Sequence, residues 1–285
     1  MKQLIKYTNS RGEEISFSNE KPVLLQAIDG LSESEVNNIS YKNVGQDGET
    51  YNYSELGKKQ LTISFILFGD DADHILKLRE LMLRVFNPKN GEGTLHYKYG
   101  GLERSIKCIP DGTPTIPLKG NKNIADGSVI LLAHNPFFTE PHDIGEEIST
   151  WIGGWKFKFS LPFRFKQKGD TKRNITNNGH IETPLEIIFK GPAVNPSITN
   201  YTTGEFIKVN RTLTTDDTLV ITTEFGNKTV EISRNEGEKI NAFNFIDLDS
   251  TFFNLQVGDN LLEYSTENLE PQSVEIKYKN RYLGI

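Results

Sequence analysis

Two carboxylates two residues apart are the pair in this chain best suited to chemistry. Asp247 and Asp249, in segment 245–251, would point to one side of an extended strand. Such a pair can bind calcium or act as the two carboxylates of a glycosidase. However, calcium needs several oxygen ligands, and the EF-hand loop pattern is absent. We therefore favour a turn-forming or solvated role for both aspartates.

Trp151 and Trp155 flank the short segment 152–154, which contains two glycines. Aromatic rings exposed on a β domain can stack on sugars, so these residues are candidates for a glycan or partner contact. Both lie close to a predicted domain boundary. Packing at that junction is therefore the reading we favour.

The remaining reactive side chains give no catalytic or metal-binding pattern. Cys108, the only cysteine, lies in the alternating segment 104–109 and is expected to be a buried structural residue. His142 could act with Asp143 or Glu146, but a solvated linker is favoured. The five histidines lack zinc-type spacing, and no phosphate loop, dinucleotide motif or GxSxG elbow occurs. We predict no enzymatic activity, no metal and no cofactor.

Composition and charge favour a soluble β protein without nucleic acid as partner. The chain has 285 residues, 17 Phe and 10 Tyr, and its net charge is −6. Nucleic-acid binding requires clustered cationic residues. One local cluster reads as a solvated strand face, or as a contact for an acidic protein. Its members are Lys156, Lys158, Arg164, Lys166, Lys168, Lys172 and Arg173. Neither a signal peptide nor a membrane span is evident.

The hydrophobic patterns predict a mainly β protein of two domains, divided near Asn135-Pro136 into residues 1–135 and 136–285. Strands are expected at 4–15 (with a turn), 23–28, 61–67, 93–99, 104–109 and 128–133 in the first part. Ile75, Leu78, Leu81, Met82 and Val85 predict one helix that ends at Asn87-Pro88. The polar, glycine-rich segment 41–55 reads as a long exposed loop.

The second part has short strands at close spacing, which is typical of a β-sandwich or jelly roll. Segments 157–165, 185–189, 206–209, 219–223, 230–233, 252–255 and 261–264 are the expected strands. Val274, Ile276 and Tyr278 alternate with polar residues near the C-terminus. This last strand is expected to close the sheet of the outer sandwich.

Several short segments together resemble the siphophage distal tail protein family of Gram-positive hosts, the siphovirus-type tail components. The matching pieces occur in order over nearly the whole chain: 7–12, 24–30, 45–48, the helix ending at 86–88, 135–138, 177–179, 191–198, 203–207, 248–253 and 278–284. Each piece alone is weak, and their order carries the resemblance.

The resemblance implies an N-terminal β domain with a helix that assembles into a hexameric ring, and a C-terminal galectin-like β-sandwich. The ring would join the tail tube to the tail-associated tip protein, and the outer domain would hold receptor-binding proteins. The protein would be made in the host bacterial cytoplasm and act at the virion tail tip. Some relatives carry inserted carbohydrate-binding modules, and this chain has no insertion long enough for one.

Three functions follow as hypotheses. The leading one is a structural tail-tip (baseplate) hub. The alternative is a carbohydrate-binding adsorption module that recognises host cell-wall glycan, with Trp151 or Trp155 as contacts. The third is a glycan hydrolase that uses Asp247 and Asp249.

Overall fold

The computed structural model describes residues 3–117, 123–148, 151–152, 167–168, 171–234, 237–268 and 273–285. Strands dominate the described chain, which has one α-helix and two short 3₁₀ helices, η1 (Pro88–Asn90) and η2 (Phe243–Phe245). The chain divides into two units. Unit 1 comprises residues 1–141 together with 282–285, and unit 2 comprises residues 142–281. The mainly β prediction is confirmed.

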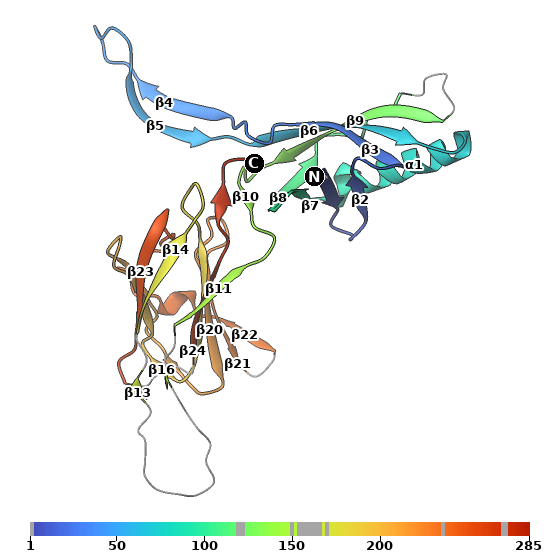
Figure 1. Ribbon diagram of the computed structural model, residues 1–285. Helices are drawn as coiled ribbons and strands as arrows, with labels where there is room; N and C mark the ends of the chain where they lie inside the picture. The colour runs from blue at the N-terminus through green and yellow to red at the C-terminus, as the bar shows by residue number, and fades with distance from the viewer. Residues whose placement is uncertain are drawn as a thin grey trace, which may run out of the picture. The chain divides into compact units, whose positions relative to one another are not determined.

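Unit 1 is built on a sheet whose main path runs β2-β1-β7-β8-β9-β6-β3, with β10 paired to β8 and β25 paired to β10 (Figure 1). Its strands are β1 (Gln3–Thr8), β2 (Glu14–Phe17), β3 (Val23–Asp29), β6 (Lys59–Phe68), β7 (Gly93–Tyr99), β8 (Leu102–Pro110), β9 (Ile124–Ala133), β10 (Phe138–Thr139) and β25 (Arg281–Tyr282). The predicted strands of the first part are thus present.

The two ends of this path meet, so the sheet curls back on itself. Just after β2, Ser18 forms a bridge with Leu24 of β3, and the Leu25 amide donates to the Ser18 carbonyl at 2.8 Å. On the other side, β8 pairs with β7 along most of its length and with β9 only at Ile109 and Pro110. A sheet closed in this way has few unpaired edges and encloses its own core.

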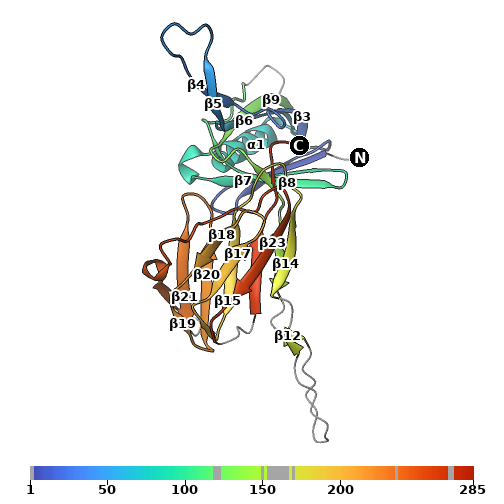
Figure 2. The same ribbon diagram turned by 90° about the vertical axis from the view of Figure 1, so that its left-hand side faces the viewer.

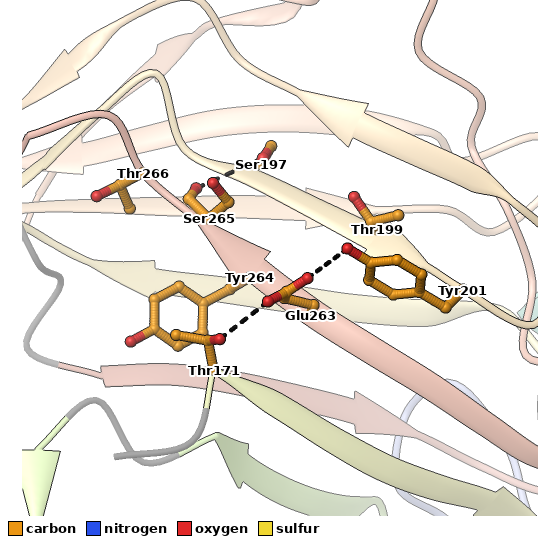
Figure 3. A pocket seen from close by; sticks show the side chains of 8 residues that line it. All are labelled: Thr171, Ser197, Thr199, Tyr201, Glu263, Tyr264, Ser265 and Thr266. Atoms are coloured by element: carbon orange, nitrogen blue, oxygen red, sulfur yellow. Dashed lines mark hydrogen bonds between the residues drawn. The ribbon is translucent and has the colours of Figure 1, made fainter. Parts of the chain in front are cut away.

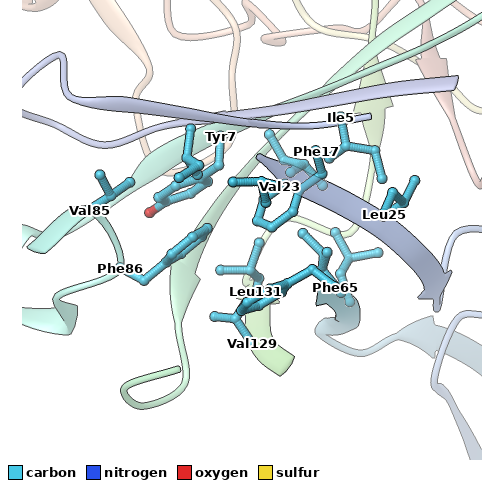
Figure 4. Packing of buried hydrophobic residues seen from close by; sticks show 14 of the residues in the cluster. Ile5, Tyr7, Phe17, Val23, Leu25, Phe65, Val85, Phe86, Val129 and Leu131 are labelled. Atoms are coloured by element: carbon cyan, nitrogen blue, oxygen red, sulfur yellow. The ribbon is translucent and has the colours of Figure 1, made fainter. Parts of the chain in front are cut away.

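Aromatic rings fill the enclosed core (Figure 4). Tyr7 stacks on Phe86 with ring centroids 4.7 Å apart, and Phe17 lies 5.4 Å from Phe65. All four rings are fully buried. Aromatic side chains remove a large apolar area from water, so these rings contribute strongly to the stability of unit 1. They come from β1, β2, β6 and the end of the helix, so one cluster ties these elements together.

The helix α1 (Ala72–Val85) begins at Asp71, whose carboxylate accepts from the His74 amide at 2.8 Å. Ile75, Leu78, Met82 and Val85 are buried, as the 3.6-residue period predicts, and Leu81 is partly buried. The helix ends at Phe86, whose amide bonds to the Met82 carbonyl and whose ring enters the aromatic core.

The prediction of a long exposed loop at residues 41–55 is wrong. Residues of this segment form a hairpin of β4 (Val36–Tyr41) and β5 (Thr50–Leu56), which extends away from the curled sheet of unit 1 (Figures 1 and 2). Both strands are exposed along almost their whole length. Because neither face is buried, the sequence shows no strict alternation of apolar and polar residues there. We call residues 36–56 the arm.

Unit 2 is a β-sandwich of two antiparallel sheets. The larger sheet has the order β11 (Ile144–Ile148), β24 (Ser273–Tyr278), β15 (Leu185–Lys190), β20 (Asp217–Thr222), β21 (Thr229–Arg234) and β22 (Glu238–Asn241). The smaller has β14 (Lys172–Asn177), β23 (Gly258–Ser265), β17 (Ser197–Asn200) and β18 (Glu205–Lys208). Two short pairs are β16 (Ala193–Val194) with β19 (Thr212–Leu213) and β12 (Trp151–Ile152) with β13 (Gln167–Lys168).

Inward-facing residues of both sheets form one buried cluster, so the sheets pack face to face. Phe189 and Val274 come from the larger sheet, and Ile198 and Leu262 from the smaller. This agrees with the predicted sandwich. Segment 252–255 is not a strand, although Leu255 forms an isolated β-bridge with Thr183. The expected strand at 157–165 lies outside the described residues.

The C-terminal segment does not simply close the sandwich, contrary to our expectation. β24 is an interior strand between β11 and β15, whereas β25 pairs with β10 of unit 1. In unit 1, Tyr282 is buried, donates to Glu140 at 2.8 Å, and lies under the Arg104 guanidinium at 3.7 Å. The division after residue 141 falls later than the expected 135 because β10 and the buried Phe138 still belong to unit 1.

We expect Gly93→Ala to destabilise unit 1 by about 2 kcal/mol, because a Cβ there would lie 2.6 Å from the Thr8 carbonyl oxygen and 2.6 Å from the buried Tyr7 hydroxyl. Chemical denaturation of the full chain measures the effect. Gly101→Ala is the matched control, since a Cβ at Gly101 meets nothing within 4 Å. Equal stability of the two variants would contradict the tight approach of β7 to Tyr7.

Tyr282→Ala should cost about 3 kcal/mol, because it removes a buried ring from the core of unit 1. Tyr282→Phe keeps the ring and loses only the hydrogen bond to Glu140, so it should cost about 1 kcal/mol. Thermal unfolding of both variants separates the two terms. If Tyr282→Ala unfolded like the wild type, the C-terminal segment would not anchor unit 1.

Candidate functional site

The aspartate pair forms a turn and lies on no strand. The Asp247 carboxylate accepts from the Asp249 amide at 3.1 Å and from Asn210 at 3.4 Å, and its carbonyl accepts from the Ser250 amide. The bond from Asp249, followed by that from Asn210, holds the pKa of Asp247 below its ordinary value. The hydrogen bonds that the Asp249 and Ser250 amides donate to Asp247 confirm the turn-forming interpretation.

Only Trp151 of the two candidate tryptophans lies within the described residues. Trp151 lies in β12, where its backbone pairs with Lys168. Trp155 is outside the described residues, as are Lys156, Lys158, Arg164 and Lys166 of the expected basic face. Lys172 and Arg173 of that face are exposed on β14, and each is paired with a carboxylate: Lys172 with Glu263 at 3.6 Å and Arg173 with Glu146 at 2.8 Å.

The remaining candidate residues, Cys108, His142 and Asp143, form no catalytic group in the described structure. Cys108 is buried, and burial raises the pKa of its thiol to about 12, so it is no nucleophile. Asp143 lies 3.5 Å from Lys279 instead of engaging His142. No cluster of three or more potential metal ligands occurs within the described residues. None of the helices in that part of the chain has the length and apolarity needed to cross a membrane.

The arm carries large exposed side chains on both of its faces. Ile39 lies opposite Tyr53 in the register, and Tyr41 lies two residues further along β4, beyond a bulge between Ile39 and Ser40. All three are large apolar or aromatic residues with between a third and just over half of their surface exposed. On the opposite face, Ser54 donates to Asn38 at 2.6 Å and bonds at 2.9 Å to the hydroxyl of Tyr51, which is itself 62% exposed. We call the face that carries Ile39 and Tyr53 the apolar face of the arm, and its exposed side chains suit it to contact another protein.

A buried lysine fixes the base of the arm. Lys59 is only 1% exposed, and its ammonium donates to the Glu33 carbonyl and to the Ser34 hydroxyl and lies over the Phe138 ring at 5.8 Å. Burial lowers the pKa of Lys59, against the opposing effect of Glu33. The Gly57 amide bonds to the Glu35 carbonyl at 2.8 Å and closes the hairpin. The direction in which the arm leaves unit 1 is thus set by packed residues.

A second feature is a hollow of about 350 Å³ on the outer face of the smaller sheet of unit 2 (Figure 3). Its lining is rich in hydroxyl groups from β17, β23 and the residues beside them: Thr171, Ser197, Thr199, Tyr201, Glu263, Tyr264, Ser265 and Thr266. Along β17 and β23 the outward side chains line the hollow, whereas the inward Ile198 and Leu262 belong to the core.

Glu263 is the charged centre of the hollow. Its carboxylate accepts from the Tyr201 hydroxyl at 2.5 Å and from the Thr171 hydroxyl at 3.0 Å, as Figure 3 shows. The bond from Tyr201 is the main reason that the pKa of Glu263 lies below its ordinary value. The same bond raises the pKa of Tyr201. Glu263 is therefore an ionised acceptor at neutral pH, held in place by two donors.

Sequence reasoning missed both the hollow and the faces of the arm. A usable signal existed for the hollow, because Ser197, Thr199 and Tyr201 alternate with the buried Ile198 and Asn200 along β17 and the residue after it. That they meet Glu263 depends on the pairing of β17 with β23, whose register places Thr199 opposite Glu263. A pairing between segments more than sixty residues apart cannot be read from local pattern.

The solved structures most relevant here share this fold at low sequence identity. The SPP1 Dit (gp 19.1) protein, described as a paradigm of the hub adsorption apparatus in phages infecting Gram-positive bacteria, is 14% identical with a TM-score of 0.70. The match covers 98% of this chain and 99% of that one. Chains of the phage P2 baseplate in its activated conformation with Ca and with Sr are 14% and 13% identical, with TM-scores of 0.56 and 0.57 and full coverage of both chains. No curated protein sequence matches this chain.

Family models match both units in order. Residues 10–133 match the phage tail protein RIFT-related domain, and residues 178–282 match the C-terminal domain of the siphovirus-type tail component. Together the two matches span most of the chain, and each falls almost wholly within one structural unit. The chain therefore belongs to the siphovirus-type tail component family of phage tail proteins.

Proposed function

We propose that this protein is the structural hub of a phage tail tip, a homo-hexameric ring that connects the tail tube to the tail-associated and receptor-binding proteins. The observation that carries the proposal is the ordered match of both units to tail-protein domains. The shared fold over nearly the full length of a protein described as a hub adsorption apparatus supports it.

The arm is the element proposed to join neighbouring copies. A closed ring of identical subunits needs a heterologous interface, in which one patch meets a different patch of the next copy. An exposed apolar face on a projecting hairpin is suited to such a contact, because a two-stranded hairpin gains little stability alone in water. The anchored base at Lys59 would present that face at a constant angle.

The proposed hub is not an enzyme. Its candidate carboxylates, Asp247 and Asp249, are used in a turn, and Cys108 is buried. The tube protein, the tip protein and a receptor-binding protein are its proposed partners, and its site of action is the tail tip after synthesis in the host cytoplasm. The division of labour we propose gives ring assembly to unit 1 and outward contacts to unit 2.

We expect the double variant Ile39→Ser, Tyr53→Ser to shift the purified protein from ring to monomer, because it replaces two facing residues of the apolar face of the arm. Both side chains are exposed in the single chain, so folding should be retained. Sedimentation velocity measures the assembly, and circular dichroism measures the fold.

Phe225→Ser is the matched control, since Phe225 is 94% exposed but belongs to a turn of unit 2. It should leave the ring intact. Rings of unchanged stability in the arm variant, or equal loss of rings in the control, would count against the arm as the contact.

The structural role also predicts that purified protein releases no sugar from host cell-wall polysaccharide. The Asp247→Asn, Asp249→Asn variant should assemble as the wild type does, because only a surface turn is altered. Reducing-end assays and sedimentation test the two statements. Hydrolysis by the wild type that is lost in this variant would revive the glycosidase hypothesis.

A further inference from the structure

The hollow of unit 2 has the chemistry of a ligand site and not of an ordinary strand surface. Its volume of about 350 Å³ lies at the lower end of the range for small-molecule pockets, about 300–1,000 Å³. Drug-like pockets are lined mainly by apolar groups, whereas this lining is dominated by hydroxyls. Each hydroxyl can both donate and accept a hydrogen bond. A ligand that carries many hydroxyls of its own would match this lining.

The Glu263 carboxylate at the centre of the hollow can accept a further hydrogen bond. An ionised carboxylate offers about four lone-pair sites. The hydroxyls of Tyr201 and Thr171 occupy two of them, and the Lys172 ammonium contacts the carboxylate as well, at 3.6 Å. Glu263 keeps 23% of its side chain exposed and is ionised at neutral pH. It is therefore ready to accept from a donor that enters the hollow, without any reorganisation of its own partners.

Tyr201 supplies an aromatic surface in a fixed orientation. Its hydroxyl is bonded to Glu263, and the Lys172 ammonium lies 4.3 Å from the ring centroid. Tyr201 as a whole residue is still 52% exposed. A half-exposed aromatic ring with a fixed polar end can pack against the apolar C–H face of a sugar while neighbouring groups bond to its hydroxyls.

We propose that this hollow, centred on Glu263 and Tyr201, binds a neutral saccharide. Tyr201 supplies the stacking surface, Glu263 accepts from sugar hydroxyls, and Thr199 and Ser197 complete the polar contacts. The site lies on the sandwich itself, so it requires neither an inserted module nor the two tryptophans. It adds a glycan contact to the proposed hub and is independent of how the ring assembles.

Charge balance favours a neutral sugar over an anionic polymer. Lys172 lies 3.6 Å from Glu263, so the two charges offset each other. Lys208, opposite Ser197 in the register, is paired with Glu267 at 3.2 Å. The site also favours binding over hydrolysis, because glycosidases need a second carboxylate about 5–10 Å from the first and Glu263 is the only carboxylate among the described lining residues.

The test is a ligand-observed NMR titration of the full chain with methyl glycosides of glucose, galactose and N-acetylglucosamine, and with glycerol phosphate as an anionic probe. We expect at least one glycoside to bind saturably with a Kd in the millimolar range. Glu263→Gln should weaken that binding about tenfold, since it removes a charged acceptor. Tyr201→Ala should abolish it.

Glu231→Gln is the matched control, because Glu231 also lies on a strand of unit 2 and pairs with a lysine, Lys239, at 3.2 Å. It should bind as the wild type does. The proposal is overturned if no glycoside binds, if Glu263→Gln keeps wild-type affinity, or if only glycerol phosphate binds. Sedimentation of the same variants keeps the two proposals apart, since ring assembly should not change with any of them.

Discussion

A two-stranded hairpin cannot bury either of its own faces, and this constraint explains why the arm is suited to contact another protein. Elsewhere in the described chain, the large apolar residues of the strands mostly enter one of two closed cores. On the arm, Ile39 and Tyr53 lie opposite each other and remain exposed, and so does Tyr41 further along β4. Exposed apolar surface of this kind is costly in water and is typical of protein contacts. A second protein surface is the simplest way to remove that cost.

The rest of unit 1 supplies the rigidity that such a contact requires. The sheet returns on itself at Ser18 and Leu24, and stacked aromatic rings fill its interior. Lys59 ties the base of the arm to this body, while Tyr282 brings the end of the chain back into it. The first and last parts of the sequence therefore stabilise the same unit. Unit 2 has a core of its own.

Which residues are buried could be predicted from the sequence, whereas which distant strands pair could not. Ile75, Leu78, Met82 and Val85 repeat with the helical period because one side of α1 is buried. The arm escaped prediction because strands exposed on both faces carry no period-two signal. The hollow escaped because Tyr201 and Glu263 are ordinary surface residues until β17 and β23 pair. The return of Tyr282 to unit 1 is likewise a long-range contact.

We propose that the protein assembles through its arm into a closed ring. Cryo-electron microscopy of the purified wild-type protein tests it most directly. We expect a ring with a central channel, in which the apolar face of each arm lies against a different surface of the next copy. Single particles with uncovered arms, or two-fold dimers joined arm to arm, would contradict it.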